Sequence, residues 1–258
     1  MRKVVKIIKS KPVMEGAGVK LKRVFGNSNE FDPFLLLDHF GSSNPNDYMK
    51  GFPWHPHRGI ETVTYMVRGE VEHGDSLGNK GVIKSGEVQW MTAGSGIIHQ
   101  EMPHKFDGNM MGFQLWINLP QKDKMTKPRY MGVKKLVSLE KDDAKIKVIA
   151  GGDEEPVHDL FVDADYFDVD LSGDFSYKTK LKTVFIYVYE GNVNIDGEPV
   201  GEHQCALLEK EGDIFIKGNS KFIFVAGNPL NEPIAWGGPI VMNTKEELAK
   251  AFEELKDG

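Results

Sequence analysis

The sequence predicts an all-β protein with one short α-helix at its C-terminal end. Short runs of β-branched and aromatic residues, such as Glu61–Val67, are typical of strands. The chain also has 28 glycines and 13 prolines, which suit many tight turns. The strand–glycine–strand pattern of Val67–Val71 returns between Val184 and Ile195, and Gly212–Phe215 echoes Gly86–Gln89. We therefore expect the second half of the chain to duplicate the first.

The first 125 residues are expected to form one domain. Alternating residues predict two strands within residues 4–8 and 19–24, joined by the turn Glu15–Gly18. Phe34–Leu37 follows as a short buried run. The segment Pro120–Arg129 is charged, contains two prolines and lacks periodicity, so we interpret it as the linker between the domains. This interpretation places the domain boundary between residues 125 and 126.

The β pattern resumes in the second domain, residues 126–258. Lys145–Ile149, Tyr166–Leu171 and Val184–Tyr189 are expected strands, and Asp196–Gly197 is typical of a hairpin turn. The expected helix begins after Thr244, which forms a capping box with Glu247. Its apolar positions, which should pack on a barrel, are Leu248, Ala251, Phe252 and Leu255.

Two pairs of metal-ligand residues, each spaced i, i+2, are the main functional feature. His55 and His57 precede the strand at Glu61–Val67, and His99 and Glu101 follow a glycine-rich turn. Alternate side chains of a strand point to the same face, so each pair can aim both side chains into one cavity. Three imidazoles and one carboxylate suit a divalent first-row metal and leave coordination positions free.

Other residues compete for a role at this site. Glu61 is a rival carboxylate, and the residues alone do not decide between Glu61 and Glu101. His39, His73 and His104 flank the pairs, and a structural role is favoured for them. Gln114 lies on an expected strand, where a contact with a bound ligand and a purely structural hydrogen bond are equally compatible with the pattern. Aromatic and methionine residues on nearby strands are expected to line a pocket: Trp90, Met91 and Phe113.

The motifs resemble those of the pirin family of the cupin superfamily. The segments HPHRGIETVTY, GEVQWMTAGSGIIHQEMP and GFQLWINLP are similar to pirin sequences, as is LLLDHFG at Leu35–Gly41. The resemblance is dense over residues 30–130 and looser beyond. It implies two tandem cupin jelly-roll β-barrels, with the metal in the N-terminal one. The second half lacks an H-x-H pair, and His158 and His203 are isolated, so we expect its barrel to be metal-free.

The resemblance also implies a ligand set and an activity. The metal ligands are then His55, His57, His99 and Glu101, with Glu61 orienting an imidazole. Fe(II) is the favoured metal, and Mn, Co, Ni, Cu or Zn fit the same ligands. No residue is assigned to an organic cofactor. Relatives resemble flavonol dioxygenases, so we favour a quercetin 2,3-dioxygenase-like oxidoreductase with Glu101 as its catalytic base. The alternative is a non-enzymatic, redox-sensitive iron protein that binds a transcription factor or a metabolic enzyme.

Composition limits the partners and the compartment. One cysteine, Cys205, excludes an internal disulfide and indicates a reducing, cytoplasmic setting. A net charge of −6 argues against direct binding to nucleic acid. No apolar segment has the length of a membrane span, and the start of the chain lacks the apolar core of a signal peptide. We expect a monomer whose partner is a small planar aromatic substrate or another protein.

Overall fold

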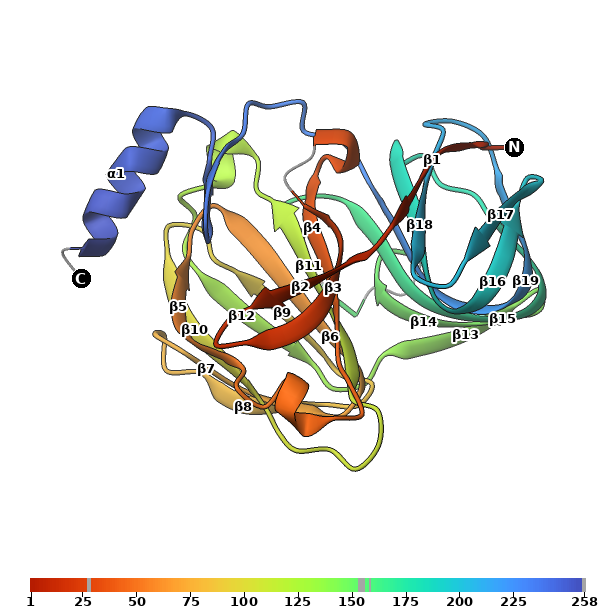
Figure 1. The fold of residues 1–258 in the computed structure, drawn as a ribbon. Coiled ribbons are helices and arrows are strands. Elements are labelled where there is room, and N and C mark those ends of the chain that lie inside the picture. The colour runs from red at the N-terminus through yellow and green to blue at the C-terminus, as the bar shows by residue number, and fades with distance from the viewer. Residues whose placement is uncertain (27–28, 153–155, 158, 257–258) are drawn as a thin grey trace. The chain divides into compact units, whose positions relative to one another are not determined.

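The computed structural model describes residues 1–26, 29–152, 156–157 and 159–256, and it confirms the all-β prediction. The chain forms two compact units, each assembled from separate stretches (Figure 1). The first, which we call the histidine unit, contains Pro12–Asn27, Phe34–Lys134 and Leu230–Gly258. The second, the long-strand unit, contains Met1–Lys11, Ser28–Pro33 and Lys135–Pro229. These units differ from the two contiguous segments expected from the sequence, residues 1–125 and 126–258. Met1–Lys11 belongs to the long-strand unit, and Leu230–Gly258 belongs to the histidine unit.

The described part of the histidine unit contains two large antiparallel sheets and the two-stranded antiparallel sheet β20-β21. The larger has the strand order β12-β9-β6-β11-β4-β3-β2, and the smaller has the order β5-β10-β7-β8. β5 is an edge strand, which suits Pro56, because proline cannot donate a hydrogen bond to a neighbouring strand. The strands are β2 (Lys11–Glu15), β3 (Val19–Gly26), β4 (Phe34–Phe40), β5 (Phe52–His57), β6 (Ile60–Arg68), β7 (Glu70–Asp75), β8 (Lys80–Lys84), β9 (Val88–Thr92), β10 (Ile97–Pro103), β11 (Met111–Asn118) and β12 (Arg129–Val133).

A row of polar side chains crosses the larger sheet. In the strand register Arg23 lies opposite Asp38, Asp38 opposite Gln114, and Gln114 opposite Thr64. Residues directly opposite one another on antiparallel strands share a face of the sheet. These four residues therefore point to the same side, and we call them the polar row.

The segment Pro120–Arg129 is not the interdomain linker that its composition predicted. It lies within the histidine unit, where Gln121–Asp123 forms a 3₁₀ turn and Arg129 starts β12 beside β9. Lys124 is buried, and its Nζ atom donates to the carbonyl oxygens of Gly59 and Val241 and to Oδ1 of Asn118. Composition misleads here because this lysine is a buried hydrogen-bond donor rather than a solvated one.

The C-terminal segment also belongs to the histidine unit. It contains β20 (Ala235–Gly237), β21 (Ile240–Met242) and the helix α1 (Lys245–Lys256). The predicted capping box is confirmed, since the Glu247 amide donates to Oγ1 of Thr244 at 3.1 Å and the Thr244 amide donates to Glu247 at 2.9 Å. Ala251, with Leu248 and Leu255, packs on Ile240 and Met242 of β21.

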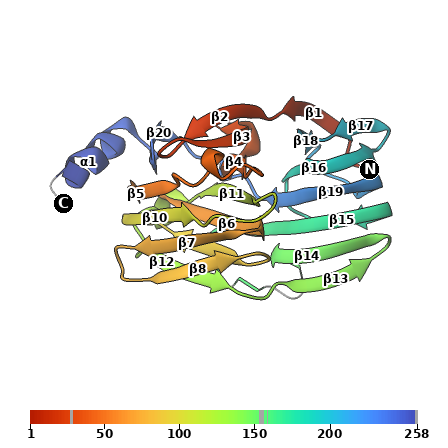
Figure 2. The ribbon, with the colours of Figure 1, turned by 60° about the horizontal axis from the view of Figure 1, so that its bottom comes forward.

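The long-strand unit is built on a sheet with the order β1-β18-β16-β19-β15-β14-β13, and β17 adds to β16 (Figure 2). Asp196 and Gly197 form the predicted hairpin turn, both with positive φ. Glu190–Gly191 lies at a bulge inside one continuous strand rather than between two strands. The strands are β1 (Val4–Lys9), β13 (Val137–Lys141), β14 (Ala144–Ala150), β15 (Ala164–Tyr177), β16 (Thr183–Ile195), β17 (Glu198–Gly201), β18 (Gln204–Leu208) and β19 (Ile214–Gly227), and the 3₁₀ turn Asn29–Phe31 accompanies them.

Candidate metal centre

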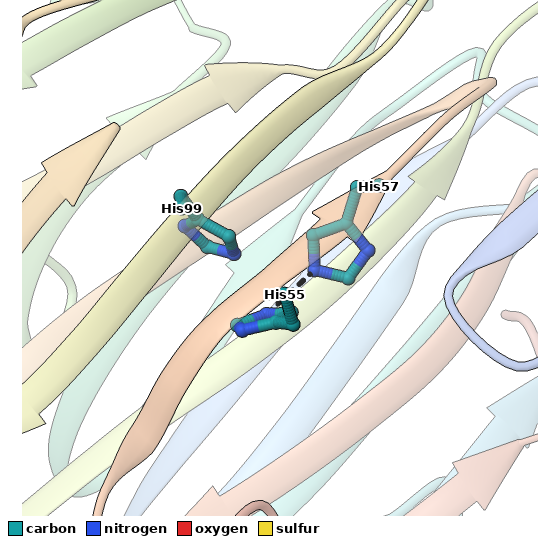
Figure 3. Close-up of side chains that lie close together, drawn as sticks. All are labelled: His55, His57 and His99. Atoms are coloured by element: carbon teal, nitrogen blue, oxygen red, sulfur yellow. Dashed lines mark hydrogen bonds between the residues drawn. The ribbon is translucent and has the colours of Figure 1, made fainter. Parts of the chain in front are cut away.

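Three of the four predicted ligands come together in the histidine unit. β5 carries His55 and His57, and β10 carries His99, which lies opposite His55 in the strand register. One ligand atom from each imidazole lies within 4.8 Å of the other two. Figure 3 shows the three rings converging from the two neighbouring strands. The two strands position the histidines as the alternation of side chains predicted.

The hydrogen bonds of His55 and His57 define which ring nitrogens are free. Nδ1 of His55 lies 2.8 Å from the carbonyl oxygen of Pro53, and Nδ1 of His57 lies 3.1 Å from that of Pro239. A carbonyl oxygen only accepts, so each Nδ1 carries the hydrogen and each neutral ring presents a bare Nε2.

These two Nε2 atoms lie 3.1 Å apart. Two facing lone pairs repel unless a cation lies between them. Two nitrogen ligands at about 2.1 Å from one ion and at right angles to each other lie about 3.0 Å apart. The observed separation therefore fits two neighbouring positions in the coordination sphere of a metal.

His99 gives independent support for a metal. Its side chain is fully buried, and neither ring nitrogen has a hydrogen-bond partner among the described residues. Buried polar groups are almost always satisfied, so an exception needs an explanation. A metal bound to one ring nitrogen explains why that nitrogen has no hydrogen-bond partner. The donor set of this site therefore fits a metal ion.

Burial keeps the imidazoles of His57 and His99 neutral, as ligation requires. It lowers the pKa of His57 to about 3, with a smaller contribution from the nearby His55. The pKa of His99 is also lowered well below its usual value, first by burial and then by its histidine neighbours.

The fourth predicted ligand, Glu101, occupies a different position. Within the described chain its carboxylate is not part of the close group of three imidazoles. Oε1 accepts a hydrogen bond of 2.6 Å from Thr64, and Oε2 accepts one of 3.1 Å from Gln114. Thr64 also lies 2.5 Å from Oε1 of Gln114, and its single hydroxyl hydrogen serves one of these two oxygens at a time. Ligation by Glu101 therefore stays a prediction.

The rival carboxylate, Glu61, is fully buried elsewhere in the unit. It accepts a hydrogen bond of 2.6 Å from Thr92 and lies 3.9 Å from Arg129. Burial raises the pKa of its carboxyl group. Trp90 also interacts with this carboxylate. The expected role of Glu61 in orienting an imidazole stays a prediction.

The remaining histidines take other positions. His73 is buried 3.3 Å from Asp75, and its ring stacks on Tyr130. His104 lies near Glu70 and Glu72. His39 contacts the ring of Phe113, and His203 lies 3.4 Å from Glu202 in the long-strand unit. His158 lies outside the described residues.

A cavity of about 790 Å³ in the histidine unit is lined by His55 and His57 of the first predicted ligand pair and by Glu101 of the second. Its polar lining includes His55, His57, Glu101, Thr64 and Gln114, and its apolar lining includes Phe40, Phe52, Trp54, Trp116 and Trp236. The predicted wall residues Trp90, Met91 and Phe113 are fully buried and do not line this cavity. Trp90 and Phe113 face away because Gln89 and Gln114, their neighbours along the strands, share the face of Thr64.

Comparisons with known proteins agree with this architecture. The family model described as Pirin matches residues 18–117, and that described as Pirin C-terminal cupin domain matches residues 166–258. A pirin-like protein of Caulobacter vibrioides is 40% identical over 272 residues, covering 100% of this chain and 99% of the relative. The chain belongs to the pirin family. The predicted pair of cupin domains is thereby confirmed.

Solved structures of the family show the same fold as this pirin-family protein. A quercetin 2,3-dioxygenase from Acinetobacter baumannii has a TM-score of 0.92 and 33% identity, covering 100% of this chain and 98% of its own. A bacterial pirin from Escherichia coli, solved in complex with nickel(II), has a TM-score of 0.69 and 24% identity, covering 87% and 99% of the two chains. Among the described residues, no helix has the length and apolar character that crossing a membrane requires.

Two parts of the site were missed by reasoning from the sequence. The carbonyl oxygen of Pro239 orients His57 from 182 residues away, and a backbone atom leaves no trace in a residue pattern. The second is Thr64, which contacts Glu101. Thr64 lies opposite Gln114 on the neighbouring strand, so the strand register would have indicated it.

Proposed function

We propose that this protein is a metal-dependent dioxygenase that acts on a flavonol or a similar planar enol. The observation that carries the proposal is the pair of facing Nε2 atoms of His55 and His57, 3.1 Å apart on the wall of the cavity. The similarity to a quercetin 2,3-dioxygenase supports the choice of reaction.

The metal would be held by His55, His57 and His99, with Glu101 as the proposed fourth ligand. Mixed histidine–carboxylate sites with open positions suit Fe(II), which we propose as the native metal. The nickel(II) complex of the Escherichia coli pirin shows that a related fold holds another first-row ion. A bound divalent ion would lower the pKa of a coordinated substrate hydroxyl.

Glu101 is the proposed base. Its carboxylate lines the cavity, and Thr64 and Gln114 hold both of its oxygens. In the proposed reaction Glu101 takes the hydroxyl proton of the flavonol. The deprotonated, electron-rich ring then reacts with dioxygen, which is the oxidant and supplies both oxygen atoms that enter the product.

The cavity wall favours a flat substrate. Trp54, Trp116 and Trp236 contribute aromatic surface, and Thr64, Glu101 and Gln114 contribute polar groups. A site of this kind binds a planar apolar molecule whose orientation is fixed by a small number of hydrogen bonds.

The proposal is tested by oxygen uptake. Protein purified without added metal is analysed for bound metal and then loaded with Fe(II), Mn, Co, Ni or Cu in separate samples. We expect at least one form to bind a flavonol without oxygen, seen as a shift of the flavonol spectrum, and to consume it when oxygen is admitted. No oxygen uptake by any form across a flavonol panel would contradict the enzyme proposal and favour a regulatory role.

Glu101→Gln tests the base. The metal-loaded variant should still bind the flavonol without oxygen. Its turnover should fall by roughly 10²–10⁴-fold, the range for loss of a general base. Turnover within a few-fold of the wild type would show that Glu101 is not the base.

A further inference from the structure

We propose that Glu15, Arg23 and Asp38 form a second recognition point in the cavity, which accepts hydroxyl hydrogens of a neutral polyhydroxylated substrate. This proposal rests on the proposed function, because it concerns the far part of the same bound molecule. We call these three residues the ion-pair cluster. All three line the cavity that also contains His55 and His57.

The strand register places Asp38 two strands away from Thr64, which contacts the proposed base. Thr64 and Gln114 hold Glu101, and Asp38 is the next residue of the polar row after Gln114. Neighbouring strands are roughly 5 Å apart, so Asp38 lies two strand spacings, or roughly 10 Å, from Thr64 along the sheet. A molecule with more than one aromatic ring can span this distance within the cavity.

The contacts inside the ion-pair cluster leave hydrogen-bonding capacity for a ligand. Arg23 donates from Nε and Nη2 to the two carboxylate oxygens of Asp38, at 2.9 and 2.8 Å. Its Nη1 atom lies 2.9 Å from Oε1 of Glu15. Each carboxylate oxygen has two lone pairs, so both acidic residues can accept further hydrogen bonds.

Charge decides what kind of group fits. Two carboxylates face one guanidinium, so the ion-pair cluster carries a net negative charge when all three groups are ionised. A neutral hydroxyl can donate to a carboxylate, whereas an anionic substituent is repelled. Burial raises the pKa of Asp38, which means that the carboxylate lacks part of its hydration, and a donor on the ligand would replace it.

The test compares matched flavonols, one with hydroxyls on its pendant ring, one without them, and one with a sulfonate there. Binding to the metal-loaded protein is measured without oxygen, by the spectral shift of the flavonol. We expect the hydroxylated flavonol to bind about tenfold more tightly than the unsubstituted one, as one hydrogen bond to a charged group allows. The sulfonated flavonol should bind most weakly.

Two variants test whether the preference for the hydroxylated flavonol arises from the ion-pair cluster. Glu15→Gln keeps the Arg23–Asp38 pair, and Asp38→Asn keeps the shape of the side chain. Each should reduce the preference for the hydroxylated flavonol several-fold and improve binding of the sulfonated one. If these residues had a purely structural role, the substitutions would weaken the binding of all three flavonols to the same extent. Asp47→Asn is the matched control, because Asp47 pairs with Lys20 at 2.8 Å in the same unit but does not line the cavity.

The outcomes separate this proposal from the proposed function. Equal binding of the three flavonols by the wild type, or variants that match Asp47→Asn, would overturn the second recognition point while leaving the enzyme in place. Absence of binding by every flavonol would overturn the proposed substrate class, and the recognition point with it. If Asp38→Asn does not fold, Glu15→Gln decides the question alone.

Discussion

The Nδ1 atom of His57 lies 3.1 Å from the carbonyl oxygen of Pro239, although 182 residues separate the two positions. Partners of this kind fix the tautomer of a ligand histidine and tune its basicity. The neighbouring residue Arg58 bonds Glu254 of α1 at 2.6 Å, and Ile240 forms an isolated bridge with Arg58. The C-terminal segment is therefore part of the candidate metal centre.

Loosening α1 should consequently weaken metal binding. Ala251 is buried against Ile240 and Met242, so Ala251→Asp would place a carboxylate in an apolar contact and shift β21 and Pro239. We expect metal affinity to fall by about tenfold, at the low end of the effect of losing a partner of a ligand. Ala249→Asp is the control, because Ala249 is exposed on the same helix. A metal titration of both variants measures the difference, and equal affinities would contradict the coupling.

The ligand set predicts how metal content responds to substitution. His57→Ala or His99→Ala should remove most of the bound metal, because each removes one nitrogen from a group of three. Glu61→Gln should retain it, since Glu61 contacts Thr92 and Arg129. Metal analysis of the purified variants is the measurement. Full occupancy in both histidine variants would show that the ligands are elsewhere, and loss of metal in Glu61→Gln with retention in Glu101→Gln would reverse the choice of carboxylate.

Lys124 should contribute strongly to stability. Burial lowers its pKa to about 8, so the amine is still mostly protonated at neutral pH and donates to three buried oxygen atoms. Lys124→Met takes one donor away from each of those oxygens and should cost about 3 kcal/mol of unfolding free energy. Lys122→Met, two residues away with an exposed side chain, should change it by less than about 0.5 kcal/mol. Urea unfolding of both variants checks this, and similar midpoints would refute the structural role.

The metal-free protein should lose stability as the pH falls. The pKa of His57 drops from 6.5 to about 3 on folding, chiefly through burial. Between these values the unfolded chain binds a proton that the folded chain does not. Stability is then fully present above about pH 6.5 and declines by about 1.4 kcal/mol for each pH unit below it. His57→Asn removes this group, so its unfolding free energy should depend less steeply on pH from 6.5 to 4. Parallel curves for the two proteins would contradict the linkage.

The local features of this protein were predictable from its sequence. Strand alternation predicted that His55 and His57 point to the same face of one strand, because side chains on a strand repeat every second residue. The capping box of Thr244 and Glu247 and the turn at Asp196–Gly197 were likewise predictable, since each depends only on residues close in the chain.

Features that depend on contacts between distant segments became known from the folded structure. It placed the first strand beside β18, buried Lys124 in a segment whose composition resembles a linker, and brought Pro239 to His57. It also set the strand register that aligns Arg23, Asp38, Gln114 and Thr64 in one row. Register and burial arise from pairing between segments far apart in the chain, and periodicity within one segment carries no information about which segment it will meet.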